Sequence, residues 1–218
     1  MERDLFLSRV ASAVMTGRLP DVPDPRPGIP EMEPADLISL FRSRAVSVST
    51  VVHGPTSRHG VPRVVAGIAS GHAATTFMAW DDLEVAGVPS TLVSAGLARV
   101  GGVVPTGPER LGHLRGYQLV DLGITGAEAG LAESGSIVLT HGPGRPRMAS
   151  LVPEVHVALL DMRLIERSLA HWSHRHPRRL TDSANLVVIT GPSRSGDIEL
   201  QLNLGVHGPR HLHVVLVN

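Results

Sequence analysis

Polar side chains that could do chemistry gather near the C-terminus, between two apolar runs, residues 186–189 and 212–217, whose pattern is typical of buried strands. The segment between them holds hydroxyl, carboxylate, imidazole and guanidinium groups: Ser193, Arg194, Ser195, Asp197, Glu199, His207 and Arg210. Carboxylates and histidine can move protons, whereas hydroxyls and arginine can hold an anion. A segment that served stability alone would have little use for this set. We therefore predict that the segment forms the functional site.

A loop of sequence GPSRSG, residues 191–196, follows the first of these runs and is predicted to open a helical turn. Its backbone amides and serine hydroxyls could cradle a carboxylate or a phosphate. We predict ligand binding by Gly191, Ser193, Ser195, Glu199 and Arg210. We predict that Asp197 and His207 transfer protons. A hydrolytic triad of Ser193, Asp197 and His207 has no local signature, because the GxSxG motif requires glycine at the position of Ser195.

A second dense stretch, residues 121–144, contains three further candidates. Thr125 and Glu128 have the spacing of a capping box at the start of a helix predicted over residues 126–133. That structural role would suffice for both side chains, and ligand binding by them is the alternative. Glu133 would end the same helix, where a carboxylate is unfavourable against the helix dipole. We therefore predict a catalytic role for Glu133.

Four Gly-Pro pairs stand directly after His53, His141, Thr190 and His207, where valine-containing runs break off. Glycine frees the backbone and proline removes a hydrogen-bond donor, so each pair is expected to end a strand abruptly. Strands that end alike suggest that their carboxyl ends meet at one edge, where open α/β sheets bind ligands. For His53 and His141, ordinary strand termination is the alternative interpretation.

Strand-like and helix-like segments alternate along residues 34–218. The predicted strands are residues 46–52, 74–80, 117–122, 136–140, 154–160, 186–189 and 212–217. The predicted helices are residues 34–44, 57–69, 126–133 and 162–174, with a short helix opened by a capping box at residues 81–84. Strands separated by short helices predict a three-layer α/β fold, with a mostly parallel sheet flanked by helices.

The N-terminal region differs from the rest of the chain. Residues 2–16 predict a short amphipathic helix, and five prolines within residues 20–30 predict an extended linker. We therefore divide the chain into an N-terminal helix with its Pro-rich linker, residues 1–33, and an α/β domain, residues 34–218. Such a helix could dock on a second subunit, so the sequence leaves a homodimer open.

Missing residue types exclude several kinds of site. The chain has no cysteine, and therefore no thiolate ligand for zinc or an iron–sulfur cluster, no disulfide and no cysteine nucleophile. All 20 basic residues are arginine, which excludes a Schiff-base lysine and the Walker lysine. A formal net charge of zero, with only 3% aromatic residues, argues against nucleic-acid binding.

We predict no metal site. The histidines at 171, 174 and 176 fit a solvated helix end, and those at 211 and 213 fit one face of a strand. The N-terminus lacks the apolar region of a signal peptide, and no window of about 18 uncharged apolar residues occurs. We therefore expect a cytoplasmic protein without a membrane span.

Three segments, GITGAEAGLAESGSIVL, LVPEVHVALL and ITGPSRSGDIELQLNLGVHGPRHLHVVLV, resemble the LUD-domain proteins, specifically the lactate-utilisation protein C (LutC/YkgG) group. The resemblance covers residues 117–218, and before them only length and element order agree. Ser136 and Ser195 stand where relatives often carry threonine, a departure that keeps the hydroxyl group.

The resemblance implies a sheet like that of the NagB/RpiA/CoA-transferase group. It also implies a role in oxidising L-lactate to pyruvate beside partner subunits that carry iron–sulfur clusters, with no cofactor in this chain. Our leading hypothesis is a subunit of a lactate-utilisation system that binds a small carboxylate, or a related anion, at the carboxyl ends of strands. The alternatives are an independent enzyme on a sugar phosphate or CoA ester, and a noncatalytic assembly or regulatory module.

Overall fold

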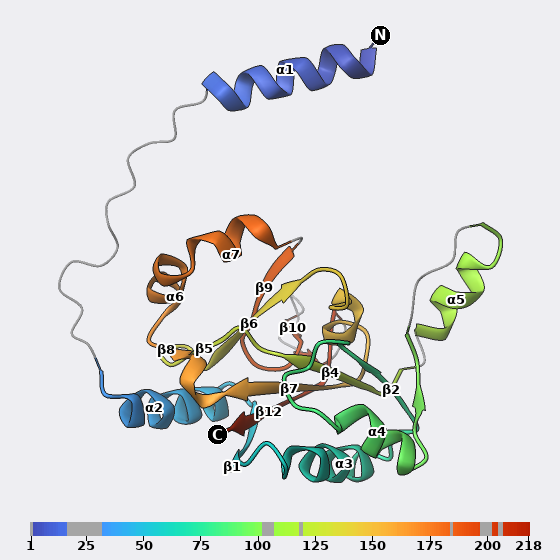
Figure 1. Cartoon of the computed structure of the whole chain (residues 1–218), viewed down its shortest axis with the longest axis vertical. Helices are drawn as coiled ribbons and strands as arrows, with labels where there is room; N and C mark the ends of the chain where they lie inside the picture. Colours follow the sequence, from blue (N-terminus) through green and yellow to red (C-terminus); the bar gives the residue numbers. More distant parts are fainter. Residues whose placement is uncertain are drawn as a thin grey trace. The chain divides into compact units, whose positions relative to one another are not determined.

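The computed structural model describes residues 2–16, 32–101, 107–117, 120–183, 185–196, 202–204 and 207–218 (Figure 1). Contacts divide the chain into two units, Met1–Pro30 and Glu31–Asn218. The first unit contains helix α1, Glu2–Thr16, which confirms the helix predicted there. The predicted Pro-rich linker lies outside the described residues.

The second unit is built around a six-stranded sheet with the strand order β1-β12-β7-β4-β2-β3. Its strands are β1 (Val51–Thr56), β12 (His211–Val217), β7 (Val155–Asp161), β4 (Leu122–Gly126), β2 (Thr76–Ala79) and β3 (Ala98–Arg99). All neighbouring strands in this sheet run parallel. The central strands β7 and β12 are buried at almost every position, as expected for parallel strands that are covered on both faces.

Helices cover one face of this sheet (Figure 1). Helices α3 (Val61–Gly71) and α4 (Val88–Ser94) place Val65 and Leu92 in a core cluster that also contains Val157 of β7. The cluster buries the helices' apolar sides against the sheet, and this burial is the main favourable term that holds the two layers together.

A second sheet covers the other face. Its order is β8-β5-β6-β9, with β8 (Ile165–Glu166), β5 (Ala129–Leu131), β6 (Ser136–His141) and β9 (Asn185–Ile189). Ile137 and Leu139 of β6 share a core cluster with Val214 of the parallel sheet and with Phe41 of helix α2 (Pro34–Ser47). Helices, parallel sheet and second sheet form three layers, and the predicted α/β fold class is confirmed.

Shorter elements complete the structure. They are α5 (Arg110–Tyr117), η1 (Arg147–Ser150), η2 (Met162–Leu164), α6 (Leu169–Arg175), α7 (Pro177–Asp182), and the antiparallel pair β10 (Arg194–Gly196) and β11 (Leu202–Leu204). Within the described ranges, no helix combines the length and the apolar character that crossing a membrane requires.

The predicted helix over residues 126–133 is wrong, because this segment forms strand β5 and the start of a turn into β6. Gly130 lets β5 approach the core closely. A Cβ atom at Gly130 would lie 2.7 Å from Leu160 Cδ2 and 3.1 Å from Phe41 Cε2. Gly135 has a φ angle of +67°, a left-handed conformation that suits the turn before β6.

Two other predicted helices are corrected by contacts between distant residues. Residues 81–84 form turns and bends rather than a helix, since the Asp81 N–H donates to the Gly144 carbonyl at 2.8 Å. Residues 162–174 divide into η2, β8 and α6, because Ile165 pairs with Gly130 of β5. Propensity along one segment yields to such tertiary contacts.

Several boundaries also move. Helix α2 extends to Ser47 and β1 begins only at Val51, so the strand predicted over residues 46–52 starts too early. The helix predicted over residues 57–69 begins at Val61. The strand predicted over residues 117–122 is wrong, because Tyr117 ends α5 and Leu122 begins β4. The GPSRSG loop leads into strand β10 rather than a helical turn.

The Gly-Pro pairs do not mark a single edge of the sheet, so that prediction is wrong. The pair after His53 lies inside β1, and the pair after His207 precedes β12. The pairs after His141 and Thr190 follow β6 and β9 of the second sheet. The carboxyl edge of the parallel sheet is instead formed by the residues that follow β1, β2, β4 and β7.

Asp121 fixes the start of β2 against the start of β4. Its Oδ2 atom accepts hydrogen bonds from the backbone N–H and the hydroxyl groups of both Thr75 and Thr76, at 2.8 to 3.0 Å. Burial opposes ionisation, but these four bonds lower the pKa of Asp121.

Asp121→Ala is therefore expected to lower the free energy of unfolding by about 2 kcal/mol, the size typical of hydrogen bonds to a charged group. Asp121→Asn, which keeps one acceptor oxygen, is expected to fall between Asp121→Ala and the original protein. Urea unfolding of the three proteins checks this, and equal midpoints would contradict the assigned role.

Candidate functional site

The parallel sheet has one point where the chain changes direction. From β2 the chain continues outward to β3, whereas from β4 it continues through β7 to β12, away from β2. Strands β2 and β4 are neighbours, with Phe77 opposite Leu122. The segments that follow them therefore diverge at the carboxyl edge, and this is where open α/β sheets form ligand crevices.

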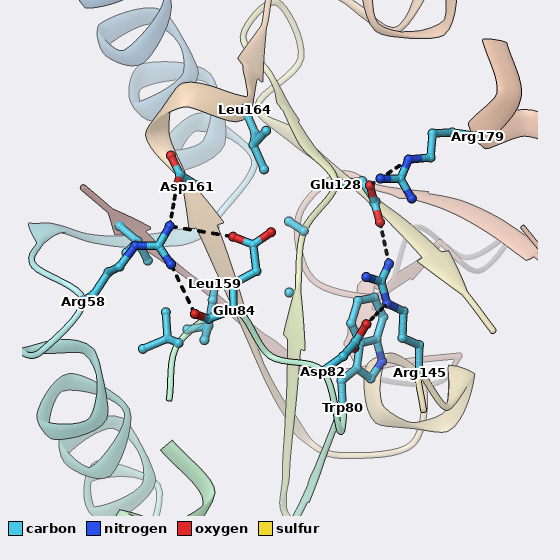
Figure 2. A pocket seen from close by; sticks show the side chains of 14 residues that line it. Arg58, Trp80, Asp82, Glu84, Glu128, Arg145, Leu159, Asp161, Leu164 and Arg179 are labelled. Atoms are coloured by element: carbon cyan, nitrogen blue, oxygen red, sulfur yellow. Dashed lines mark hydrogen bonds and ion pairs between the residues drawn. The ribbon is translucent and has the colours of Figure 1, made fainter. Parts of the chain in front are cut away.

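A cavity of about 80 Å³, here called the switch-point cavity, lies at this position (Figure 2). Trp80, Asp82 and Glu84 reach it from the segment after β2, and Glu128 reaches it from the segment after β4. Asp161 lines it from the end of β7. The carboxyl ends of three parallel strands thus contribute to one hollow.

Arg145 connects several of these groups. Its Nε donates to Asp82 Oδ2 at 2.6 Å, and its Nη1 donates to Glu128 Oε1 at 2.5 Å and to Thr140 Oγ1 at 3.1 Å. The Arg145 guanidinium carbon also lies 5.2 Å from the centre of the Trp80 ring, a cation–π distance. Burial disfavours its charge, but the carboxylates of Asp82 and Glu128 raise the pKa of Arg145.

Glu128 holds two arginines at once. Its second oxygen lies 3.5 Å from Nε of Arg179, and its side chain is only 13% exposed. Within the described ranges, this ion pair is the sole interaction of the Arg179 side chain, and its terminal nitrogens have no partner there. Figure 2 shows Glu128 between Arg145 and Arg179.

A second ion cluster lies on the other side of the cavity (Figure 2). Arg58 Nη2 donates to Asp161 Oδ2 at 2.9 Å, and its Nη1 donates to the Glu84 carbonyl at 3.1 Å. Hydrogen bonds from Arg163 have the largest effect on Asp161, and together with the charge of Arg58 they lower the pKa of this carboxyl against the opposing effect of burial. Asp161 is therefore held as a carboxylate.

The predicted residues of the second dense stretch separate. Glu128 lines the switch-point cavity. Thr125 is fully buried, with its Oγ1 2.9 Å from Nε2 of His156, so its hydroxyl is used inside the fold. The capping box is therefore wrong. Glu133 forms an ion pair with Arg167 at 2.8 Å. It does not line the switch-point cavity, and it does not line the cavity near Ser193 that is described next.

Part of the C-terminal set does come together, around a cavity of about 280 Å³ that we call the serine cavity. Gly191, Ser193 and His207 line it, and the His207 N–H donates to Ser193 Oγ at 3.3 Å. It also contains His156, whose Nδ1 has no hydrogen-bond partner in the described structure. This cavity lies by the amino end of β12, since residues 207–210 precede that strand.

The remaining predicted residues do not complete that group. Arg210 lies 3.6 Å from Glu154 in an ion pair. Ser195 is part of β10, and its side chain lies outside the described structure. Asp197 and Glu199 also lie outside the described residues. Convergence of Ser193 and His207 is thus observed, and Glu133 does not join them.

Sequence reasoning missed Arg58, Arg145, Arg179 and Asp161. One signal could have found Asp161, since it directly follows the apolar run of β7 at a strand's carboxyl end. The arginines carried no such signal, because they come from a loop, a turn and a short helix. Within the described residues, no group of three or more histidine, cysteine or acidic side chains is arranged to hold a metal ion.

Comparison with known proteins supports the resemblance read from residues 117–218. The LUD domain matches residues 81–217, well over half of the chain. A lactate utilization protein C from Halalkalibacterium halodurans is 40% identical over 110 residues, which are 44% of this chain and 46% of that protein. A lactate utilization protein C from Exiguobacterium is 40% identical over 102 residues, 45% of this chain and 44% of that protein. The matches thus span less than half the length of these relatives.

A crystal structure of a DUF162 family protein from Deinococcus radiodurans shares the fold, with a TM-score of 0.63 at 21% identity. The superposition covers 86% of this chain and 100% of that protein. The family match, the similarity to lactate utilization proteins C and the shared three-layer architecture agree with one another. This chain belongs to the LUD-domain family.

Proposed function

We propose that this chain serves in lactate utilisation and binds a small hydroxy acid in the switch-point cavity. The role in lactate utilisation follows from the similar proteins named lactate utilization protein C, and the ligand class follows from the residues that line the cavity. The observation that carries the ligand class is the presence of arginines and carboxylates around one hollow: Arg145 and Arg179 beside Glu128 and Asp82.

A hydroxy acid needs both kinds of group. Its carboxylate suits an arginine, whose planar fork of donors matches two oxygens at once. Its hydroxyl needs an acceptor, and Glu128 offers one at a short distance from both arginines. The ligand carboxylate would share with Glu128 the donors of Arg145 and Arg179.

The size of the cavity fits the same class of ligand. A cavity needs roughly 10–15 Å³ of such volume to hold a single water molecule, and each water in the liquid occupies about 30 Å³. A cavity of about 80 Å³ therefore suits a small ligand, such as a three-carbon hydroxy acid, rather than a large one.

Oxidation of such an acid to the keto acid requires an electron acceptor. This chain has no cysteine with which to ligate an iron–sulfur cluster. In the proposal, partner subunits of the lactate-utilisation system carry the clusters, and this chain binds the substrate or the product beside them. Ligand binding by this chain can therefore be measured separately from lactate oxidation by the assembly.

Calorimetric titration with L-lactate and pyruvate, with the chain alone and together with the iron–sulfur partners, tests the proposal. Arg145→Gln is expected to weaken binding at least tenfold, because it removes a charged guanidinium donor that the ligand carboxylate would use. Arg63→Gln is the matched control, since Arg63 is an exposed arginine of α3 away from the cavity. It is expected to bind as the original protein does.

Absence of binding in both settings would contradict the ligand assignment. A different result would relocate it: unchanged affinity in Arg145→Gln together with loss in Ser193→Ala would transfer the ligand to the serine cavity.

A further inference from the structure

A third cavity, of about 190 Å³, shares Arg145 and Arg179 with the switch-point cavity. It is lined in addition by Thr140, His141 and Ser183, and we call it the His141 cavity. Its chemistry differs from that of its neighbour. Four carboxylates line the switch-point cavity, whereas among the described residues none lines the His141 cavity.

His141 is the unusual member of this lining. It ends strand β6 and is only 5% exposed, yet neither of its ring nitrogens has a hydrogen-bond partner in the described structure. Its neighbour across the β6–β9 pair is Asn185, which acts on the ring without a hydrogen bond of normal geometry. Asn185 does not line the cavity, so the His141 ring is the buried polar group there that lacks a well-formed partner, although buried polar atoms are normally paired.

His141 is expected to be neutral, so it can donate one hydrogen bond to an anion without adding a positive charge to the site. Burial is the largest influence and lowers the pKa of His141, the charges of Arg147 and Arg145 lower it further, and Asn185 opposes the shift. The ring is therefore neutral near pH 7, with one nitrogen that donates and one that accepts.

Among the side chains that the structure describes, positive charge exceeds negative charge around this cavity. Arg145, Arg179 and Arg147 act on it, and the carboxylates that face these arginines in the structure are Asp82 and Glu128. Arg179 is half exposed, with a side-chain exposure of 54%, and its terminal nitrogens make no contact in the described structure. The terminal nitrogens of Arg179, next to a hollow whose described lining contains no acid, are the kind of donor that recognises oxyanions.

We propose that the His141 cavity binds an oxyanion group, a phosphate or a carboxylate, between Arg145, Arg179 and the His141 ring. The anion accepts from the free nitrogens of Arg179 and gives the donor nitrogen of His141 the partner it lacks. The site adjoins that of the hydroxy acid through the shared Arg145 and Arg179, and it provides for a second ligand or for a second anionic end on a larger one.

Titration of the full chain with inorganic phosphate, and separately with malonate, tests this inference, with calorimetry and the thermal unfolding midpoint as readouts. Saturable binding of either anion is expected, and the tighter of the two identifies which oxyanion the site prefers. His141→Gln, which changes this cavity alone, is expected to weaken binding several-fold, and Arg179→Gln at least tenfold. Arg175→Gln is the matched control, because Arg175 of α6 pairs with Glu166 of β8 and lines neither cavity.

The inference is overturned if neither anion binds saturably, or if binding is the same in His141→Gln, Arg179→Gln and the original protein. Since Arg179→Gln keeps the buried histidine, it tests the site even if His141→Gln fails to fold. Because these probes are not hydroxy acids, failure of L-lactate to bind leaves this result unaffected, and the reverse is also true.

Discussion

Replacing Gly123 by alanine is expected to destabilise the fold by about 3 kcal/mol or more, the upper range for overpacking in a core. Gly123 lies in β4 between β2 and β7, with Met78 and His156 as its partners in register. A Cβ atom there would lie 1.8 Å from the carbonyl oxygen of Ala149. The strand cannot move aside because it is hydrogen-bonded on both edges, so η1 must be displaced. Urea unfolding measures the loss.

Gly67→Ala provides the control for this substitution. Gly67 lies inside helix α3, and a Cβ atom there would meet nothing within 4 Å. Alanine is favoured over glycine in a helix interior, so this variant is expected to gain about 0.5–1 kcal/mol. If Gly123→Ala were as stable as the original protein, η1 would not be packed against β4 as described.

Acidification from pH 6.5 to pH 5 is expected to lower the free energy of unfolding by about 2 kcal/mol through His156 alone. Burial lowers the pKa of His156 from 6.5 to about 3, with smaller contributions from His141 and His213. The unfolded chain takes up a proton below pH 6.5, whereas the folded chain does not until about pH 3. Stability is therefore complete above pH 6.5 and falls by about 1.4 kcal/mol per pH unit below it.

Other buried histidines act in the same direction. Burial, followed by His53 and His72, lowers the pKa of His213 to about 4. The pKa values of His53, His72 and His141 are lowered as well, in each case mainly by burial. Carboxyl groups with lowered pKa values contribute only at more acidic pH, near about 4 and below. The interval from pH 6.5 to 5 thus isolates the histidines.

Unfolding curves at several pH values between 7.5 and 5 check this expectation. His156→Gln is expected to have a shallower slope of stability against pH, since one proton-binding site of the unfolded chain is removed. His59→Gln, which changes an exposed histidine before α3, serves as the matched control and should keep the original slope. Equal stability at pH 7 and pH 5 would contradict the burial of neutral histidines.

The sequence predicted the strands whose burial is continuous. The runs that became β6, β7 and β12 are apolar over most of their length, because both of their faces are covered. Strand β9 was also predicted from its apolar run, although it is only partly buried. Strand β5 was missed since AGL has no strand-like alternation. Its place in the sheet is set by Gly130, whose close contact with Leu160 no local pattern reveals. The spacing of Thr125 and Glu128 fitted a capping box as well as it fitted a ligand site. Only the three-dimensional structure distinguishes these two interpretations.

The site was harder to predict than the fold. Glu128 was among the residues predicted to bind a ligand, and it lies at the switch-point cavity with ion pairs to Arg145 and Arg179. The Arg58–Asp161 pair joins residues 103 positions apart, so it depends on the order and direction of the strands. The C-terminal set misled because Ser193 and His207 lie beside the amino end of β12, whereas the prediction required a carboxyl end. The residue types indicated which chemistry is available. The edge of the sheet on which those residues lie could be determined only from the strand topology.

Three histidines with lowered pKa values stand in a row on the helix-covered side of the parallel sheet. His53 Nε2 lies 2.9 Å from His213 Nδ1, and His213 Nε2 lies 3.0 Å from His72 Nε2. Each neutral ring carries a single proton, so the row has only two fully bonded arrangements, one the reverse of the other. Passing between them changes the tautomer of all three rings together. A substitution at either end by a side chain that can only donate, or only accept, a hydrogen bond therefore fixes which nitrogen of His213 is protonated.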